Sequence, residues 1–275
     1  MQNLQLTPQQ IESYNNNGYL IIKNFLSKPE VDKLYAVATG DGTLQKHAFD
    51  LNDQTGKKTK LTLWYTPGND AYGLLTKSKR MVDNAGALMD GQSEVCHFHS
   101  KLMQKEPKVG GAWEWHQDYG YWYKNEFLFP NQMISIMVAI TGANKANGCL
   151  QVIKGSHKMG RIEHAFAGEQ VGASQHYVDL ALKTMPLVYV EINAGDALIF
   201  HSNTLHRSEA NTSDKARWSL ISVYNRSGNV PYNEPSQSST VPLKAVPDEA
   251  LIEWQTEGIG AGANFLEKEK DEALK

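Results

Sequence analysis

Residues 195–206 read Gly195-Asp196-Ala197-Leu198-Ile199-Phe200-His201-Ser202-Asn203-Thr204-Leu205-His206, and they run from a turn through a short apolar strand to a histidine. Other β-branched and aromatic runs recur along the chain between turn signals, a pattern typical of strands. The strands predicted in this way are Val95–Leu102, Met133–Ile140, Cys149–Ile153, Leu187–Ile192, Ala197–Phe200 and Ser219–Tyr224. Many short strands around one histidine-rich constellation predict a mainly β fold with flanking helices, a jelly roll whose two sheets enclose a site.

The N-terminal part of the chain has helix-start signals in place of strand signals. Thr7-Pro8-Gln9-Gln10 combines an N-cap, a proline at the first helical position and a capping-box glutamine, which predicts a helix through about Tyr14. Ser27-Lys28-Pro29-Glu30 predicts a second helix in the same way, and Tyr19–Ile22 between them is a short strand candidate. Residues 40–60 are polar and rich in Gly, Asp and Lys, so they are interpreted as a loop.

The composition predicts a single domain spanning residues 1–275. We divide it into a helical portion at about 1–90, a jelly-roll core at about 91–230 and a tail at about 231–275. Within the core, the polar segment Gly160–Thr184 is expected to be an insertion that is partly helical. At the end of the tail, the charged segment Asn264–Lys275 is expected to form a solvated helix.

Charge and hydropathy exclude several classes of partner. The net charge is −3 and the sequence pI is about 6.3, with Lys and Arg scattered, so neither nucleic acid nor an anionic membrane surface is expected as a partner. Mean hydropathy is −0.47, and no apolar run approaches the roughly 18 residues needed to span a bilayer. Two cysteines, Cys96 and Cys149, give no disulfide framework, which favours a reduced, cytoplasmic setting. A monomer or a homodimer is expected.

His116-Gln117-Asp118 places an imidazole and a carboxylate two residues apart. Together with a distant histidine they could form a two-histidine, one-carboxylate face on Fe(II), which leaves positions open for a cosubstrate and O₂. His206 and His201 both compete for the place of the second histidine. Arg217 follows His206 by eleven residues.

With these motifs the chain resembles the phytanoyl-CoA dioxygenase family of Fe(II)- and 2-oxoglutarate-dependent oxygenases. The resemblance spans nearly the whole chain and rests on separated motifs in the family's order. These are Leu6-Thr7-Pro8-Gln9-Gln10-Ile11 with Gly18-Tyr19-Leu20, Trp115-His116-Gln117-Asp118, Asn147-Gly148-Cys149-Leu150-Gln151-Val152-Ile153-Lys154-Gly155-Ser156-His157, Gly195–His206, and Asn211-Thr212-Ser213-Asp214-Lys215-Ala216-Arg217-Trp218. The fold that the resemblance implies is the cupin-like double-stranded β-helix, in agreement with the jelly roll predicted above.

The resemblance also implies roles for individual residues. His116, Asp118 and His206 would bind iron, and the family pattern selects His206 over His201. Arg217 would pair with the distal carboxylate of 2-oxoglutarate, because a planar guanidinium can grip a carboxylate with two hydrogen bonds. Ser208 would donate a further hydrogen bond to that carboxylate. His99 and Met103 would line the cosubstrate pocket, where Met103 departs from the polar residues common in relatives.

The activity that the resemblance implies is hydroxylation of an unactivated C–H bond of a small metabolite. Fe(II), 2-oxoglutarate and O₂ would be required, with release of succinate and CO₂. A small, polar or zwitterionic substrate is expected, since no extended basic patch is evident for the phosphates of coenzyme A. Three alternatives stay open at this point: acyl-CoA 2-hydroxylation, a metal cupin enzyme that does not use 2-oxoglutarate, and a non-catalytic binding protein on the same fold.

Several residues near the metal motif have both a functional and an ordinary interpretation. Trp122, Gln117 and Tyr119 are the candidates for substrate binding. Trp122 lies six residues after His116, where the resemblance to small-molecule hydroxylases of the family implies an aromatic residue that contacts substrate. Lys101 and Lys105 could recognise an anionic substrate or could simply lie at the surface. Ordinary roles are expected for the rest: structural for His97, turn packing for His157, core for Trp113, Trp115 and Cys149, surface for His47, His164 and His176, and surface or salt-bridge positions for Arg207 and Arg226.

Overall fold

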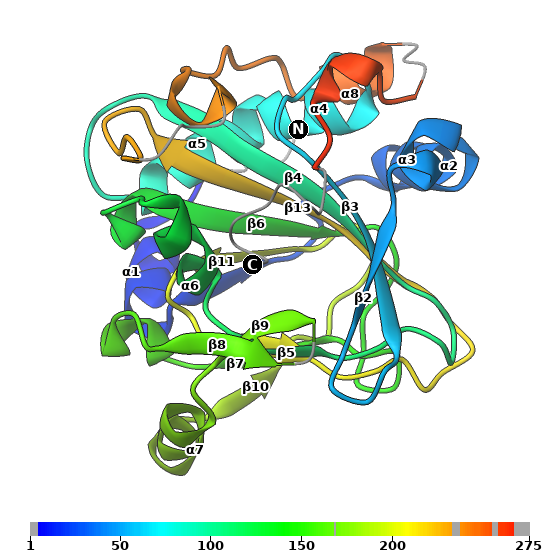
Figure 1. The fold of residues 1–275 in the computed structure, drawn as a ribbon. Helices are drawn as coiled ribbons and strands as arrows, with labels where there is room; N and C mark the ends of the chain where they lie inside the picture. The colour runs from blue at the N-terminus through cyan, green and yellow to red at the C-terminus, as the bar shows by residue number, and fades with distance from the viewer. Residues whose placement is uncertain (1–4, 168, 233–236, 255–257, 267–275) are drawn as a thin grey trace.

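Two facing antiparallel sheets make up the centre of the protein, as predicted. The computed structural model describes residues 5–167, 169–232, 237–254 and 258–266. The large sheet has the strand order β1 (Tyr19–Ile22), β11 (Ala197–His201), β6 (Met133–Ala139), β13 (Arg217–Arg226), β4 (Val95–Lys105), β3 (Lys58–Trp64) and β2 (Phe49–Asn52). The small sheet has the order β10 (Leu187–Tyr189), β7 (Leu150–Ile153), β12 (His206–Ser208) and β5 (Trp113–His116). In Figure 1 the small sheet lies below the large one.

Helices cover the outer face of the large sheet, above it in Figure 1. The α-helices are α1 (Pro8–Asn17), α2 (Lys28–Gly40), α3 (Gly42–Lys46), α4 (Ala71–Lys77), α5 (Lys79–Leu88), α6 (Asp118–Trp122), α7 (Gln175–Thr184) and α8 (Ala250–Glu253). Short 3-10 helices occupy Tyr123–Asn125, Pro130–Gln132, Ser156–Met159, Gln237–Thr240 and Ala261–Ala263. Within the described ranges, every helix is too short or too polar to cross a lipid bilayer.

Alternate residues of the central strands face two different cores. On β13, Leu220 points to the helices, whereas Ile221 points into the space between the sheets. On β6, Val138 points to the helices and Met137 points into the space between the sheets. Because both faces are covered, all ten residues of β13 and all seven of β6 are buried, which explains why the sequence of β6 is an almost continuous apolar run and does not alternate. The inner core is the one that borders the site.

The two predicted helix starts are confirmed. Thr7 accepts a hydrogen bond from the Gln10 backbone N–H, and the Gln10 side chain accepts one from Thr7 N–H, which completes the capping box of α1. Ser27 and Glu30 form the equivalent box at α2. The predicted strand Tyr19–Ile22 is β1.

The prediction of a loop at residues 40–60 is wrong. Asp41 caps α3 by accepting from the backbone N–H groups of Thr43 and Leu44, at 2.7 and 3.3 Å. The strands β2 and β3 then form a hairpin that extends the large sheet beside β4. The polar composition hid the two strands, because β3 pairs with β4, which is distant in the sequence, and β2 pairs with β3.

The remaining strand predictions hold with shifted ends. β4 and β13 extend beyond their predicted limits, and β10 ends at Tyr189, three residues before the predicted end. Asn147-Gly148 forms the predicted turn: Gly148 has φ +75°, and a Cβ there would stand 2.3 Å from the carbonyl oxygen of Glu209. A side chain at this position would therefore be strained and would also collide with the chain leading out of β12.

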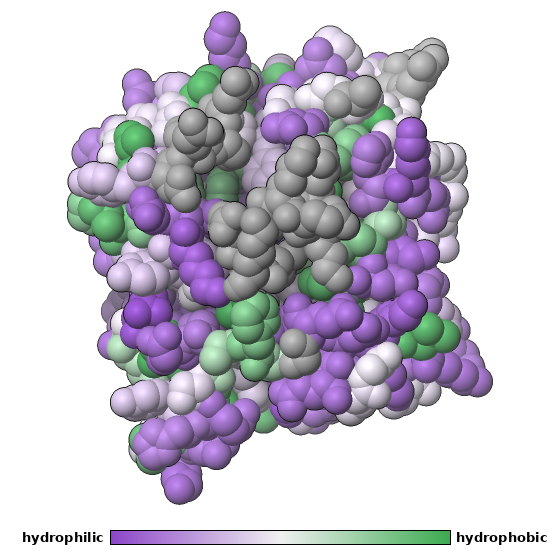
Figure 2. Space-filling view, viewed as in Figure 1, coloured by the Kyte–Doolittle hydropathy of each residue, from purple (hydrophilic) through white to green (hydrophobic). Residues whose placement is uncertain are grey.

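The segment 160–184 is partly helical, as expected. It forms a hairpin of β8 (His164–Ala167) and β9 (Gln170–Ala173) and then α7, which projects below the small sheet in Figure 1. The predicted terminal helix at 264–275 lies outside the described residues except for 264–266. Figure 2 shows that the coloured surface on this side is mainly hydrophilic, with hydrophobic residues in small groups.

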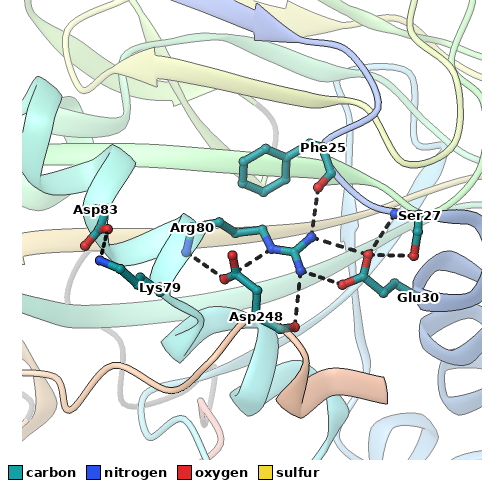
Figure 3. Close-up of polar contacts among 7 residues, drawn as sticks. All are labelled: Phe25, Ser27, Glu30, Lys79, Arg80, Asp83 and Asp248. Carbon is teal, nitrogen blue, oxygen red and sulfur yellow. Dashed lines mark hydrogen bonds and ion pairs between the residues drawn. The ribbon is translucent and has the colours of Figure 1, made fainter. Parts of the chain in front are cut away.

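A buried ion-pair network holds the helical layer together (Figure 3). Arg80 of α5 forms an ion pair with Glu30 of α2 at 2.7 Å and with Asp248, just before α8, at 3.3 Å. Arg80 also donates hydrogen bonds to the carbonyl oxygens of Phe25 and Asp248. The side chains of Arg80 and Glu30 are only 8% and 6% exposed, so each charge depends on the other for compensation.

We expect Arg80→Ala to lower the free energy of unfolding by about 3–5 kcal/mol, because it leaves the Glu30 carboxylate buried without its partner. Lys79→Ala is the matched control, since the neighbouring Lys79 pairs with Asp83 at the surface, where such a pair contributes at most about 1 kcal/mol. Urea unfolding followed by circular dichroism measures both. Equal unfolding midpoints for the two variants would contradict the role assigned to Arg80.

Candidate active site

The three predicted iron ligands come together where the inner core meets the small sheet. His116 is the last residue of β5 and His206 is the first of β12, and the two residues pair directly across these adjacent strands. Asp118 opens α6 immediately after β5, so the chain turns the carboxylate back toward the two histidines. All three are buried, with 2–4% of their surface exposed.

The ligand atoms are close enough to share one metal ion. One atom from each of His116, Asp118 and His206 lies within 4.8 Å of the others. The Oδ1 atom of Asp118 is 3.7 Å from Nε2 of His116 and 3.8 Å from Nε2 of His206. Two neutral imidazoles and a carboxylate on one side, with the other side open, are the ligand set of non-haem Fe(II) oxygenases.

Hydrogen bonds outside the triad fix the direction of each ligand. The Nδ1 atom of His116 bonds to the carbonyl oxygen of Glu114 at 2.8 Å, and that of His206 bonds to the carbonyl oxygen of Thr204 at 2.9 Å. Each contact reaches two residues back along the chain. This arrangement leaves both Nε2 atoms for the metal, and such outer partners tune ligand orientation and basicity.

The electrostatics of the site favour the metal-binding protonation states. Burial, followed by the neighbouring His116, lowers the pKa of His206 to about 3, so its imidazole is neutral near pH 7. Burial alone would raise the pKa of Asp118, but the Lys101 ammonium and the two imidazoles outweigh burial and hold this pKa well below its usual range. A neutral imidazole and an ionised carboxylate are the forms that bind Fe(II).

Ser135 is a site residue that the sequence interpretation missed. It lies in β6, and its Oγ donates a 2.6 Å hydrogen bond to Oδ2 of Asp118, which leaves Oδ1 facing the histidines. A signal was present in the sequence, because Ser135 is the one polar residue in the apolar run Met133–Ala139. An isolated hydroxyl in a buried strand needs a partner, and here the partner is a metal ligand.

We expect Ser135→Ala to weaken Fe(II) binding about 10- to 100-fold, the range typical for outer partners of metal ligands. Ser100→Ala is the matched control: Ser100 is equally buried, but it bonds to His97 and Ser222 on the other face of the sheet. Anaerobic competition with a chromogenic chelator measures the dissociation constant for Fe(II). An unchanged constant in Ser135→Ala would show that the serine does not orient Asp118.

Arg217 lies on the inner face at the start of β13, and no ion pair to it is found in the part of the chain that the structure describes. The residue is 3% exposed, and its buried Nε has no hydrogen-bond partner among the described residues. Two residues further on, Ser219 Oγ is also buried without a partner. Burial lowers the pKa of Arg217 to about 10, which leaves the guanidinium protonated near pH 7. Arg217 Nε and Ser219 Oγ lie on one face of β13 and both can donate a hydrogen bond. A ligand that accepts hydrogen bonds, such as a carboxylate, would satisfy both donors.

Lys105 links the backbone at Ser208 to the strand pair that carries Arg217. Lys105 pairs with Arg217 across β4 and β13, and its Nζ donates to the carbonyl oxygens of Ser208 and Glu209, the first at 3.3 Å. Lys105 is fully buried, so of the two interpretations weighed from the sequence the surface position is excluded. The lysine connects the large sheet to the end of β12. The start of β13, which carries Arg217, and the end of β12, which carries Ser208, are therefore joined through Lys105.

His99 and Trp122 lie together at the other end. Both are buried, and their rings are 6.1 Å apart in a T-shaped contact. Tyr119 is buried too, but its hydroxyl donates to the Phe127 carbonyl oxygen. Met103 belongs to the inner core as an apolar wall. Trp122 belongs to the same inner core, where its ring also contacts Phe98, and its substrate role stays a prediction.

The Gln117 amide is occupied by the backbone. It donates to the carbonyl oxygens of Gly160 and Asn203, at 2.7 and 2.8 Å, and accepts from Ile162 N–H at 2.9 Å. These bonds join the segment after β7 to the turn before β12. We therefore expect Gln117 to position the metal ligands on either side of it instead of contacting substrate.

The expectation that His164 lies at the surface is wrong. His164 is 8% exposed, and its Nε2 accepts a 2.9 Å hydrogen bond from the backbone N–H of Gln117, between two metal ligands. Its imidazole also lies where Gly120 has no side chain, since a Cβ there would be 2.3 Å from Nε2. Burial lowers the pKa of His164 to about 4, so the ring stays neutral and can accept this bond.

Arg226 is likewise buried, contrary to expectation. Its guanidinium donates hydrogen bonds to the carbonyl oxygens of Gly86, Met89, Asp90 and Ser93, and these bonds tie α5 and the following turn to β13.

His201, the alternative ligand, bonds to Asn131 and Asn203 outside the triad. The other expectations hold. Trp115 and Cys149 are buried, His97 has a structural role through its bonds to Tyr65 and Ser100, His176 is exposed, and Arg207 forms an ion pair with Glu209. His47 is half-buried and stacks on Phe265, and Trp113 is half-buried against the inner core.

Comparison with known proteins agrees with this geometry. The family model of phytanoyl-CoA dioxygenase matches residues 14–219, more than half of the chain. The L-proline trans-4-hydroxylase of Streptomyces griseoviridis is 27% identical over 233 residues, which cover 79% of this chain and 86% of that protein. The methylphosphonate hydroxylase of Gimesia maris is 28% identical over 231 residues, covering 81% and 82%.

Solved structures share the fold. EctD from S. alaskensis with bound Fe superposes with a TM-score of 0.73 at 18% identity, over 90% of each chain. The same enzyme with 2-oxoglutarate and 5-hydroxyectoine gives a TM-score of 0.67 at 17% identity, over 90% of each chain. The predicted fold and the predicted enzyme class, a dioxygenase, are thereby confirmed. The chain belongs to the phytanoyl-CoA dioxygenase family.

Proposed function

We propose that this protein hydroxylates an unactivated C–H bond of a small, polar metabolite in a reaction that requires Fe(II), 2-oxoglutarate and O₂ and releases succinate and CO₂. The observation that carries the proposal is the pairing of a buried two-histidine, one-carboxylate triad with a buried, uncompensated Arg217. The triad alone would suit other metal enzymes. The orphaned guanidinium calls for a bound carboxylate, which 2-oxoglutarate supplies.

Two groups of residues would bind the metal and the cosubstrate. His116, Asp118 and His206 would hold the iron, while Arg217, Ser208 and the newly recognised Ser219 would hold the distal carboxylate of 2-oxoglutarate. When bound, the metal and its cosubstrate supply the oxidising chemistry. The chain contributes orientation, because Ser135, Glu114 and Thr204 fix the ligands, and it contributes exclusion of water, because the ligands are almost fully buried.

The metal cupin that does not use 2-oxoglutarate is the less favoured alternative, since Arg217 would then stay buried without a counter-charge. The acyl-CoA alternative differs from the proposal only in substrate, and coenzyme A phosphates require cationic groups that the sequence does not cluster. The single domain, the cytoplasmic setting and the monomeric or homodimeric state stay predictions from the sequence.

Anaerobic titration of the Fe(II)-loaded protein with 2-oxoglutarate tests the proposal. Chelation of Fe(II) by the cosubstrate should produce a weak visible charge-transfer band that saturates with one equivalent of 2-oxoglutarate. If iron is bound but the band does not form, the proposal is wrong, and the alternative, a metal cupin enzyme that does not use 2-oxoglutarate, is favoured. Adding O₂ to the loaded protein should then yield succinate in the presence of substrate.

A further inference from the structure

The turn that leads into the metal ligand His206 crosses from one sheet to the other. The chain leaves β11 of the large sheet at His201 and begins β12 of the small sheet at His206, so residues 202–205 lie in neither strand. All four of these residues are buried. Because the segment lies outside the strand ladders, contacts from other parts of the chain must satisfy its polar groups and set its conformation.

Thr204 connects this turn to the N-terminal helix on one side and to the metal ligand on the other. Its Oγ1 donates a 2.7 Å hydrogen bond to the carbonyl oxygen of Gly18, the residue that caps the end of α1. The backbone N–H of His201 donates to the same oxygen at 2.9 Å. The carbonyl oxygen of Thr204 in turn accepts the 2.9 Å hydrogen bond from Nδ1 of His206. The Thr204 side chain therefore links α1 to the imidazole that would bind the metal.

The conformation and the surroundings of Gly18 both require glycine. Its φ is +80°, the left-handed conformation in which glycine ends a helix. A Cβ atom here would stand 2.4 Å from Nδ1 of His157 and 2.8 Å from Oγ1 of Thr204. The His157 ring is itself held against the helix end, because its Nε2 donates to the carbonyl oxygen of Asn15 at 3.0 Å. Thr204 can approach the end of α1 this closely only because Gly18 has no side chain.

Three sequence motifs that lie far apart in the chain meet at this turn. The opening motif contributes Gly18, the motif at 147–157 contributes Ser156, and the motif at 195–206 contributes Thr204. The Ser156 Oγ accepts a 2.8 Å hydrogen bond from the backbone N–H of Leu205, so the turn is held from both sides. The proposed function gives the opening motif no part in binding metal or cosubstrate. Its contact with Thr204 supplies a reason for its presence.

We propose that Thr204 is a positioning residue for the iron site: its hydroxyl, bonded to the carbonyl oxygen of Gly18, fixes the carbonyl group that orients the His206 imidazole. The helix α1 thereby supports the metal centre without touching the metal. This inference rests on the iron site of the proposed function, but it does not depend on the cosubstrate or the substrate. Without the hydroxyl, the Thr204 carbonyl would hold Nδ1 of His206 less firmly, and a less well oriented ligand binds its metal more weakly.

Thr204→Val removes the hydroxyl and keeps the branched shape of the side chain. We expect the dissociation constant for Fe(II), measured by anaerobic competition with a chromogenic chelator, to rise about tenfold, the lower end of the range for outer partners of metal ligands. Thr204→Ser restores the hydroxyl and should bring the constant back to within about threefold of the wild type.

Thr62→Val is the matched control. Thr62 is as fully buried as Thr204, and its Oγ1 also donates to a distant backbone carbonyl, that of Leu44 at 3.1 Å, but on the helix side of the large sheet. The Fe(II) constant of this variant should stay within about twofold of the wild type. Thermal unfolding of the metal-free proteins verifies that both valine variants are folded.

Two measurements report positioning directly. The visible d–d bands of the Co(II)-loaded protein depend on the geometry of the ligand set, and they should differ from the wild type in Thr204→Val but not in Thr62→Val. In the wild type, Fe(II) should slow hydrogen exchange at the backbone amides of Gly18 and His201 by up to about tenfold, because coupling between two sites is reciprocal. This second measurement needs no variant, so it decides the question even if Thr204→Val fails to fold.

Three results would overturn the proposal. Equal Fe(II) constants in Thr204→Val and Thr62→Val would show that the hydroxyl does not orient His206. A Thr204→Ser variant as weak as Thr204→Val would assign the effect to side-chain volume and not to the hydrogen bond. Exchange at Gly18 and His201 that ignores Fe(II) would show that α1 is not coupled to the metal. A wild type that binds no Fe(II) would overturn the proposed function as well, whereas ordinary wild-type binding keeps that function intact whatever the variants show.

Discussion

Asp118→Ala should leave a folded protein that neither retains iron nor turns over substrate. Asp118 is the only carboxylate in the triad, and its Oδ1 lies between the two imidazoles. Without it, two neutral imidazoles offer Fe(II) neither the charge nor the third ligand of the facial set. We expect iron content after anaerobic reconstitution to fall to background and succinate formation to fall below detection.

Thermal unfolding separates loss of iron from loss of fold. Fe(II) binds the folded wild type, so adding it should raise the Tm by mass action, whereas the Tm of Asp118→Ala should not respond. Asp214→Ala is the matched control, because Asp214 is an exposed aspartate paired with Lys108. If Asp118→Ala bound iron as tightly as Asp214→Ala, the metal site would lie elsewhere.

Arg217→Met should raise the dissociation constant for 2-oxoglutarate by roughly 30-fold to several thousand-fold, which corresponds to the 2–5 kcal/mol lost when one partner of a buried charge pair is truncated. Iron binding should be unaffected, since Arg217 is not in the triad. Titration of the charge-transfer band with 2-oxoglutarate measures the constant directly. Arg217→Lys should recover part of the loss, because an ammonium keeps the charge but not the two-pronged geometry.

Arg207→Met is the control for this measurement. Arg207 precedes Ser208 on the same strand, but it pairs with Glu209 and Gln151 toward solvent. The cosubstrate constant should stay within about twofold of the wild type, a change under about 0.5 kcal/mol. An unchanged constant in Arg217→Met as well would mean that another group holds the distal carboxylate and that the orphaned guanidinium has a different partner.

Local sequence predicted the elements whose signals lie within a few residues. The caps at Thr7 and Ser27, the turn at Asn147-Gly148 and the apolar strands β6 and β11 each form from neighbouring residues, so short-range patterns were sufficient. The region 40–60 was misjudged for the opposite reason. Its strands are polar on one side and gain their stability from pairing with β4, about 40 residues away.

The site shows the same difference between what neighbouring residues indicate and what depends on contacts between distant residues. The spacing of His116 and Asp118 suggested a metal site, and the resemblance to the family, whose motifs follow in the same order, implied the third ligand and Arg217. Sequence alone gave no reason to join Ser135 to Asp118 or His164 to the backbone between the ligands. These contacts link residues 17 and 47 positions apart, and they exist only after the sheets have closed.

The sequence by itself therefore determined the strand content, through local periodicity, and the family with its ligand types, through motifs that stand in the family's order. The tertiary structure alone decided which buried groups have partners. It gave Lys105 two carbonyl oxygens and Arg226 four, and among the described residues it left Arg217 Nε without a hydrogen-bond partner. Whether a charge is compensated depends on burial and on the positions of distant atoms, and this property supports the proposed place of the cosubstrate carboxylate.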